Sequence, residues 1–213
     1  DTNNVAVGFQ SGVAVSTGIN NVLIGTTAGS NITTGGTNTL VGSGIQAGAA
    51  DGDGCNGLGY SITAAAGYTT LGSGTDDIRA AHGNVTWAVV SDERYKKDIV
   101  DSTAGLSFIN ALQPRTFKYK TLGELPETFN AYEADSTEVF KNSDTNHGFI
   151  AQEVKAAIDA DDSIKDGFRL WDDRDDGSQE VAEAALIPVL VKAIQEQQTT
   201  IESLIARITT LEG

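Results

Sequence analysis

The segment VVSDERYKKDIV, residues 89–100, holds the side chains best suited to chemistry. A serine, Ser91, is followed by acidic and basic residues that include two lysines, Lys96 and Lys97. A serine hydroxyl becomes an effective nucleophile only when a base takes its proton. A lysine can be that base when burial or nearby cations bring its pKa towards neutrality. The segment is therefore either a place where the chain reacts with itself or a solvated linker between two architectures.

Composition excludes several classes of protein. The net charge of −15 argues against nucleic-acid binding and against docking on an anionic membrane. No apolar run approaches the ~18 residues of a membrane span, so we expect no membrane insertion. One cysteine, Cys55, and two histidines, His82 and His147, leave no Cys/His zinc site, and we expect no metal and no cofactor. Cys55 is interpreted as a small buried residue. Because the chain begins without Met, we expect a fragment of a longer protein.

The distribution of charge and glycine places a boundary at residues 80–91. Residues 1–78 contain no Lys and no Arg, and 18 of the 24 glycines precede residue 84. From Ser91 onward the composition is that of an ordinary α/β domain. We therefore predict two domains, residues 1–90 and residues 91–213, with the reactive segment where they join.

The first domain repeats every 17 residues. Each repeat carries an apolar residue followed by glycine, and a fixed period of this size indicates stacked supersecondary units with one short β run each. Only three aromatic residues precede residue 84, which favours a core shared among three copies rather than one filled by a single chain. The regular register argues against disorder. The repeat resembles the β-roll heads of trimeric autotransporter adhesins and the shafts of phage tail fibres, so we expect a trimeric β-roll or a triple β-helix or prism-like shaft. The repeated positions are Asn4, Asn21 and Asn38, and Gly8, Gly25, Gly42 and Gly59.

In the second domain the spacing of apolar residues changes, and we expect an α+β fold. Capping residues followed by spaced apolar positions predict a helix over 101–112. Alternation predicts a strand over 115–120, and a polar stretch predicts a long loop over 121–146. Residues 147–158 are expected to begin as a strand and become a helix. GFRLW and SQEV, on either side of DDRDDG, read as a hairpin.

A heptad pattern runs from about residue 183 to residue 212. Isoleucine recurs every seven residues, with leucine or glutamine at the matching positions, which is typical of a coiled coil. Ile at a with Leu at d favours a dimer, whereas a threefold shaft upstream favours a trimer, and we give the shaft more weight. The alternative is a helix packed within its own domain. The predicted trimerisation residues are Ile187, Leu190, Ile194, Gln197, Ile201, Leu204, Ile208 and Leu211.

DDRDDG also has part of the spacing of a calcium-binding loop. With Asp172 as the first ligand, Asp176, Gly177 and Glu183 fall at the fifth, sixth and twelfth positions. Arg174 occupies the third ligand position, however, and no flanking helices are indicated. A solvated hairpin turn is the favoured interpretation.

Several blocks together resemble one family. SDERYKKDI, GLSFINALQPRTFKYK, HGFIAQEV and LIPVLVKAIQEQQTTIESL are similar, in this order, to the C-terminal intramolecular chaperone or peptidase S74 domain. That domain ends phage tail spikes and fibres, including endosialidases, and occurs in the myelin regulatory factor. The resemblance covers about residues 91–213, with Tyr95 where the family usually has Leu.

The resemblance implies a domain that trimerises, holds three chains in register while the shaft folds, and then cuts itself off. It implies Ser91 as nucleophile and Lys96, five residues on, as general base of a single-turnover serine endopeptidase. Arg94 and Lys97 are candidate cations that would lower the lysine's pKa. His147 is a candidate helper or a hydrogen-bonded structural histidine, and we favour the structural role.

The family is expected to cut between Ser91 and Asp92. Attack of the Ser91 hydroxyl on the Val90 carbonyl would pass through a favourable five-membered ring, whereas attack on its own carbonyl would need a strained four-membered one. Activation of water and attack on a neighbouring chain are further routes, so the choice of the Ser91–Asp92 bond rests on the family.

The expected biological setting also follows from the resemblance. The chain would be a homotrimer in a virion tail fibre or spike, with its chaperone domain released in the host cytoplasm during assembly. A bacterial surface receptor is a candidate further partner of the shaft. The alternative function is a non-cleaving trimerisation cap of a fibrous adhesin, with Ser91 and Lys96 in an ordinary surface turn.

Overall fold

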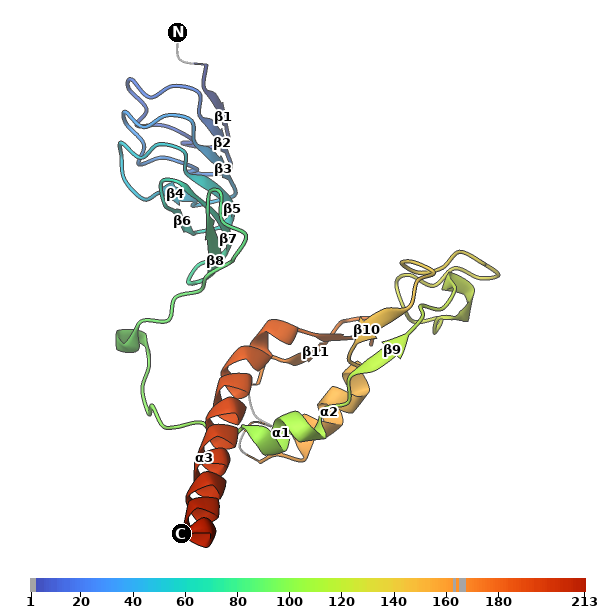
Figure 1. The fold of residues 1–213 in the computed structure, drawn as a ribbon. Coiled ribbons are helices and arrows are strands. Elements are labelled where there is room, and N and C mark those ends of the chain that lie inside the picture. The colour runs from blue at the N-terminus through green and yellow to red at the C-terminus, as the bar shows by residue number, and fades with distance from the viewer. Residues whose placement is uncertain (1–2, 163, 165–167) are drawn as a thin grey trace. The chain divides into compact units, whose positions relative to one another are not determined.

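The structure, a computed structural model, describes residues 3–162, 164 and 168–213. It divides into two compact units, Asp1–Asp98 and Ile99–Gly213, and each is described by itself (Figure 1). The division falls after the lysine-rich segment, so Ser91 and Lys96 belong to the first unit. Among the helices of the described residues, none is both long and apolar enough to cross a membrane.

The first unit is a β-solenoid-like stack of coils. Successive strands pair in parallel with an offset of 17 residues, so that Val5, Val22, Thr39 and Asn56 lie side by side. The last coil is shorter, because Asn56 pairs with Thr69, and β8 then returns antiparallel to β7. The predicted 17-residue repeat is confirmed. The main sheet runs in the order β1 (Val5–Val7), β2 (Val22–Ile24), β3 (Thr39–Val41), β5 (Asn56–Tyr60), β7 (Tyr68–Ser73) and β8 (Asp76–Ala81), and β4 (Gln46–Ala47) pairs with β6 (Thr63–Ala64).

A single chain fills the core of this unit. Leu23 and Leu40 point inward from neighbouring strands, and isoleucines from the turns meet them. The expectation that the repeat must share its core among three copies is therefore wrong. Small residues suffice because each coil is thin and stacks directly on the next. The buried cluster comprises Leu23, Ala28, Ile32, Leu40, Ile45, Ala47, Cys55, Ile62 and Ala64.

A ladder of asparagines joins the coils beside this core. The Asn21 and Asn38 side chains are fully buried, and each carboxamide oxygen accepts the backbone N–H one repeat later, as in Cys55 N to Asn38 Oδ1 at 2.8 Å. Each carboxamide nitrogen also donates to a glycine carbonyl, as from Asn38 to Gly52 O at 2.8 Å. Cys55 takes the fourth place in the register and is buried as expected, and burial raises the pKa of its thiol. The ladder explains why asparagine recurs every 17 residues.

The repeated glycines permit the close stacking. Gly42 has a φ of 137°, and a Cβ built there would lie 1.6 Å from the carbonyl oxygen of Gly59. Any larger residue at this position would force neighbouring coils apart. The apolar–Gly pair seen in the sequence is therefore a condition of the stack.

The second unit is α+β, with its core between three helices and a small hairpin. The buried cluster comprises Ala104, Phe108, Leu112, Val154, Ile158, Leu170, Leu186 and Val189. Two antiparallel pairs, β9 with β10 and β11 with β12, extend from the helices (Figure 1). The elements are α1 (Leu106–Ala111), β9 (Arg115–Phe117), η2 (Leu122–Glu124), β10 (Asn146–Gly148), α2 (Ala151–Asp159), β11 (Trp171–Asp173), β12 (Gln179–Val181), η3 (Glu183–Ala185) and α3 (Leu186–Glu212).

The predicted elements of this unit are largely present. The strand and helix expected over 147–158 are confirmed as β10 and α2, and a hairpin at DDRDDG is confirmed as β11 and β12. Its first strand begins only at Trp171, the last residue of GFRLW, and Gly167 lies outside the described residues. The first helix is shorter than predicted, because it begins only at Leu106 and the expected capping residues lie outside it. Its first N–H group, on Leu106, donates instead to Glu196 Oε2 of α3 at 2.8 Å. The Glu196 carboxylate, which belongs to another helix, thus caps the N-terminus of α1 in place of a local side chain.

Candidate functional site

The structure brings Ser91 and Lys96 together. Lys96 Nζ lies 2.7 Å from Ser91 Oγ, within hydrogen-bonding distance, and both side chains are exposed in the single chain. A nucleophile and its base must be within about 3.2 Å of each other. The pair therefore has the contact that a Ser-Lys dyad requires.

One short turn makes this contact. The 3-10 turn η1 (Glu93–Tyr95) reverses the chain, and the Lys96 N–H donates to Glu93 O at 2.8 Å. The N-cap of the turn is Asp92, whose Oδ1 accepts the Arg94 N–H at 2.9 Å. The turn contains no buried residue, so local hydrogen bonds alone shape it.

Asp92 and Arg94 form a forked ion pair over the turn. Arg94 Nε donates to Asp92 Oδ1 at 2.9 Å, and Arg94 Nη2 donates to Oδ2 at 2.7 Å. The guanidinium holds the pKa of the Asp92 carboxyl below its usual range, and the carboxylate raises the pKa of Arg94. Arg94, a candidate cation beside the lysine, is paired with Asp92. Lys97 is exposed on the same segment.

Asp92 is a contributor to the site that the sequence reasoning missed. It was considered only as a neighbour of the scissile bond. The signal was present, because aspartate is among the preferred N-cap residues and a short polar turn follows it. The Ser91–Asp92 bond itself lies in exposed chain, and the side chains of Val89 and Val90 just before it are also exposed.

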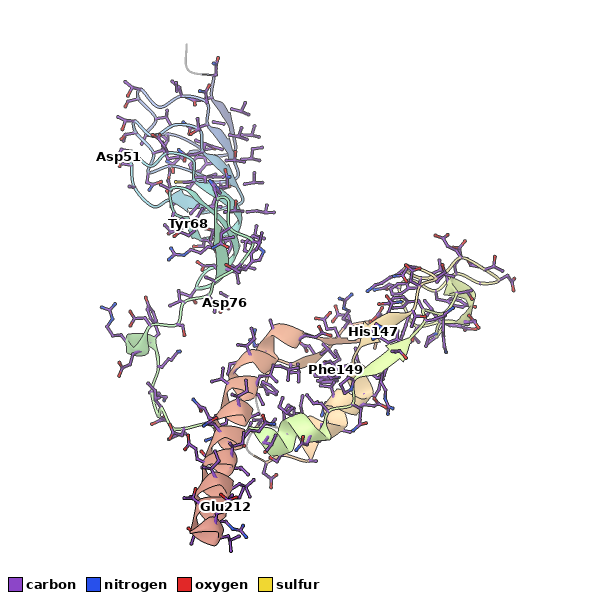
Figure 2. All side chains as sticks on the ribbon, viewed as in Figure 1. Asp51, Tyr68, Asp76, His147, Phe149 and Glu212 are labelled. Atoms are coloured by element: carbon purple, nitrogen blue, oxygen red, sulfur yellow. The ribbon has the colours of Figure 1, made fainter. Side chains whose placement is uncertain are left out.

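His147 belongs to the second unit, on β10, where it is paired with Thr116 of β9. Its side chain is exposed and makes no hydrogen bond within the part of the chain that the structure describes. The favoured interpretation as a hydrogen-bonded structural histidine is therefore not supported. Figure 2 shows His147 and Phe149 on the same arm of this unit.

His147 also lines an open groove of about 920 Å³ in the second unit, which the sequence did not predict. Three aromatic rings form part of its wall: Phe117 meets Tyr119 edge-on, with ring centroids 5.5 Å apart, and Tyr119 meets Phe140 at 5.8 Å. The loop over 121–146 reaches the β11–β12 turn through the Asn130 N–H, which donates to Asp176 Oδ2 at 3.0 Å.

Asp176 accepts hydrogen bonds within the hairpin turn and from the preceding loop. Its Oδ1 accepts hydrogen bonds from the hydroxyl and the N–H of Ser178. The Ser178 hydroxyl, together with the Asn130 and Ser178 N–H groups, lowers the pKa of Asp176 to about 2. These contacts support the hairpin interpretation of DDRDDG.

Helix α3 carries two different apolar stripes. Leu186, Val189 and Ala193 are buried against the rest of the unit. The predicted coiled-coil positions lie beside that stripe and are exposed. The alternative, a helix packed within its own domain, thus describes only the buried residues in the first turns of α3, namely Leu186, Val189 and Ala193. The exposed positions are Ile187, Leu190, Ile194, Gln197, Ile201, Leu204, Ile208 and Leu211.

Comparison with known families found one match, over the segment that begins at Ser91. The family model Peptidase_S74, described as chaperone of endosialidase, matches residues 91–162. The match starts at Ser91 itself and ends just beyond α2. It supports an intramolecular chaperone domain in this chain. The family is classed among peptidases, which is consistent with self-cleavage at the level of the family. No curated protein and no solved structure matches the chain.

Proposed function

We propose that residues 91–213 form an intramolecular chaperone that trimerises through α3, guides folding of the solenoid and then releases itself by cutting beside Ser91. The 2.7 Å contact between Lys96 Nζ and Ser91 Oγ carries the enzymatic part of the proposal. The family match from Ser91 onward supports the chaperone part. The setting we propose is a phage tail fibre or spike whose chaperone domain is released in the host cytoplasm.

Trimerisation would use the exposed stripe of α3. Seven of its eight positions are large apolar residues, and all eight are exposed in the single chain. Such a stripe is stable in water only when partner helices cover it. The neighbouring buried stripe already holds the helix to its own domain, so assembly would not require the domain to refold.

The cut we propose separates Ser91 from Asp92. Lys96 takes the Ser91 hydroxyl proton while that oxygen takes a proton from water, and the hydroxide adds to the Ser91 carbonyl carbon. The bond from that carbon to the Asp92 nitrogen then breaks, and the lysine's proton passes to the departing amine. One water is consumed, and the proton of the new carboxylic acid passes to the amine, leaving a carboxylate on Ser91 and an ammonium group on Asp92. Direct attack on Val90 would instead release a chain beginning at Ser91.

Assembly would switch the dyad on. A lysine amine in water keeps its proton at neutral pH, with a pKa near ~10.4, and burial lowers that pKa. Both side chains of the dyad are exposed in the single chain. A trimer that buries the segment would create the base only after the three chains are in register.

Intact-mass spectrometry of the denatured wild-type chain and three variants tests the proposal. Ser91→Ala and Lys96→Ala should remain whole, while wild type and the matched control Lys118→Ala, an exposed lysine outside the segment, should give residues 1–91 and 92–213. A product beginning at Ser91 would move the cut to the Val90–Ser91 bond. Intact wild type under assembly conditions would overturn self-cleavage and leave the non-cleaving trimerisation cap.

A further inference from the structure

One outer row of the solenoid is apolar in every strand. Val7, Ile24, Val41, Leu58, Leu71 and Ile78 are successive cross-strand partners, so they form one continuous line across the six-stranded sheet. We call this line the apolar ridge. Neighbouring strands lie about 4.8 Å apart, so six strands give a ridge roughly 24 Å long.

The ridge faces away from the core of its own chain. Val7 and Leu58 each keep 56% of their surface exposed, and Ile24 and Ile78 each keep 38%. The inward row beside it holds Leu23 and Leu40, which are fully buried. A contiguous apolar line of this length on an outer face usually marks an interaction surface.

Other exposed apolar residues of the solenoid do not persist along the sheet, since Val5 is followed by Val22 but then by Thr39. Phe9 and Ile19 of the first coil are also exposed, but one repeat later Thr26 and Gly36 stand in their places. The ridge is the outer row that stays apolar along the whole sheet. Because an apolar residue is kept at this outer position in every coil, we expect a partner that contacts every coil.

The surroundings of the ridge carry no charge from β1 to β7. On the same face, the row on one side is Val5, Val22, Thr39, Asn56 and Thr69, and beyond the ridge β5 and β7 continue with the uncharged Tyr60 and Ser73. The residues that directly follow the ridge are glycines without side chains, Gly8, Gly25, Gly42, Gly59 and Gly72. Asp51 lies among the turns, on the side away from β1, β2 and β3 (Figure 2). A charged or strongly polar partner would therefore find no matching group here.

We propose that the apolar ridge is the surface through which three copies of the solenoid pack against one another. This inference rests on the proposed trimer and names a second contact within it, separate from the α3 stripe. An apolar surface with one side chain every ~4.8 Å is matched best by a surface of the same period. Another copy of this solenoid provides that period, along with the same uncharged character. The shaft copies thus share an outer ridge, while each keeps its own core.

Cysteine cross-linking in the full-length chain tests the ridge. Ile24→Cys places a thiol on the ridge, and Thr34→Cys places one at an exposed position elsewhere in the same repeat. Both are made in a Ser91→Ala background, which keeps each chain in one piece. The native Cys55 is buried, so we expect it to form no cross-link in either variant. Mild oxidation joins only thiols whose Cβ atoms come within about 4 Å, so a short bis-maleimide is used in parallel to bridge a longer gap.

The ridge predicts covalent pairs from Ile24→Cys, seen on a non-reducing denaturing gel, and single chains from Thr34→Cys. Light scattering on the same samples reports the oligomeric state. A trimer in which Ile24→Cys stays unlinked, or in which both variants link equally, would overturn the ridge and leave the α3 trimer standing. A ridge reserved for a receptor would also stay unlinked. A monomer by light scattering would overturn the ridge and the proposed trimer together.

Discussion

The contact between Ser91 and Lys96 depends on side chains that lie within a few residues of it. The turn that returns Lys96 to Ser91 has no buried residue and is held by the Asp92 cap and by the Lys96 N–H on Glu93 O. A single 3-10 turn without a core is weak on its own. In the proposed dyad, Asp92 would therefore be a positioning residue that acts through the backbone.

Replacing Asp92 tests this role. Asp92→Ala removes the cap and the ion pair to Arg94, and we expect several-fold slower cleavage in an intact-mass time course. Asp92→Asn can still cap the turn, so its cleavage rate should stay nearer to that of wild type. Glu93→Ala, an acidic neighbour with an exposed side chain, is the matched control. Equal rates for Asp92→Ala and wild type would show that the turn does not position the lysine.

The asparagine ladder gives a second prediction at the residue scale. Asn38→Ala leaves the buried Cys55 N–H and Gly52 carbonyl without partners, and an unpaired buried polar group costs about 1–3 kcal/mol. Hydrogen exchange of peptides around residues 38–56 should therefore become faster. Thr34→Ala, at an exposed position of the same coil, should leave exchange unchanged. Unaltered protection in Asn38→Ala would mean that the ladder contributes little to the stack.

Among the elements, α3 combines two roles along one helix. Its buried stripe includes Leu186 and Val189, and Glu196 on the same helix binds the first N–H of α1. Its other stripe is exposed. Domain packing and the proposed chain association would therefore use different residues of the helix, so that one could be altered without the other.

Charge on the exposed stripe should prevent assembly. Ile194→Asp with Ile201→Asp would place carboxylates where an apolar seam is expected, so we predict a monomer by light scattering. The circular dichroism of the domain should be retained, because neither residue is buried in the single chain. Thr199→Asp, at an exposed position of α3 outside the predicted seam, should still assemble. A trimer from the double variant would exclude this stripe as the association surface.

Across the whole molecule, local periodicity was the part of the structure that sequence could predict. The 17-residue register, the long helix and the strand-then-helix at 147–158 all leave repeating or alternating patterns. The single-chain core was missed because several of its residues, such as Ile32, Ile45 and Ile62, come from turns and show no strand alternation. The Asp92–Arg94 pair was missed because it depends on side-chain conformations, which no spacing rule describes.

The central claim is that self-cleavage follows assembly, and native mass spectrometry of freshly folded wild-type chain tests it most directly. Samples taken over time separate monomers from trimers and show whether each species is whole or cut. We predict whole monomers, whole trimers early, and cut chains that first appear within trimers. Cut monomers that precede any trimer, or trimers that stay whole throughout, would contradict the account.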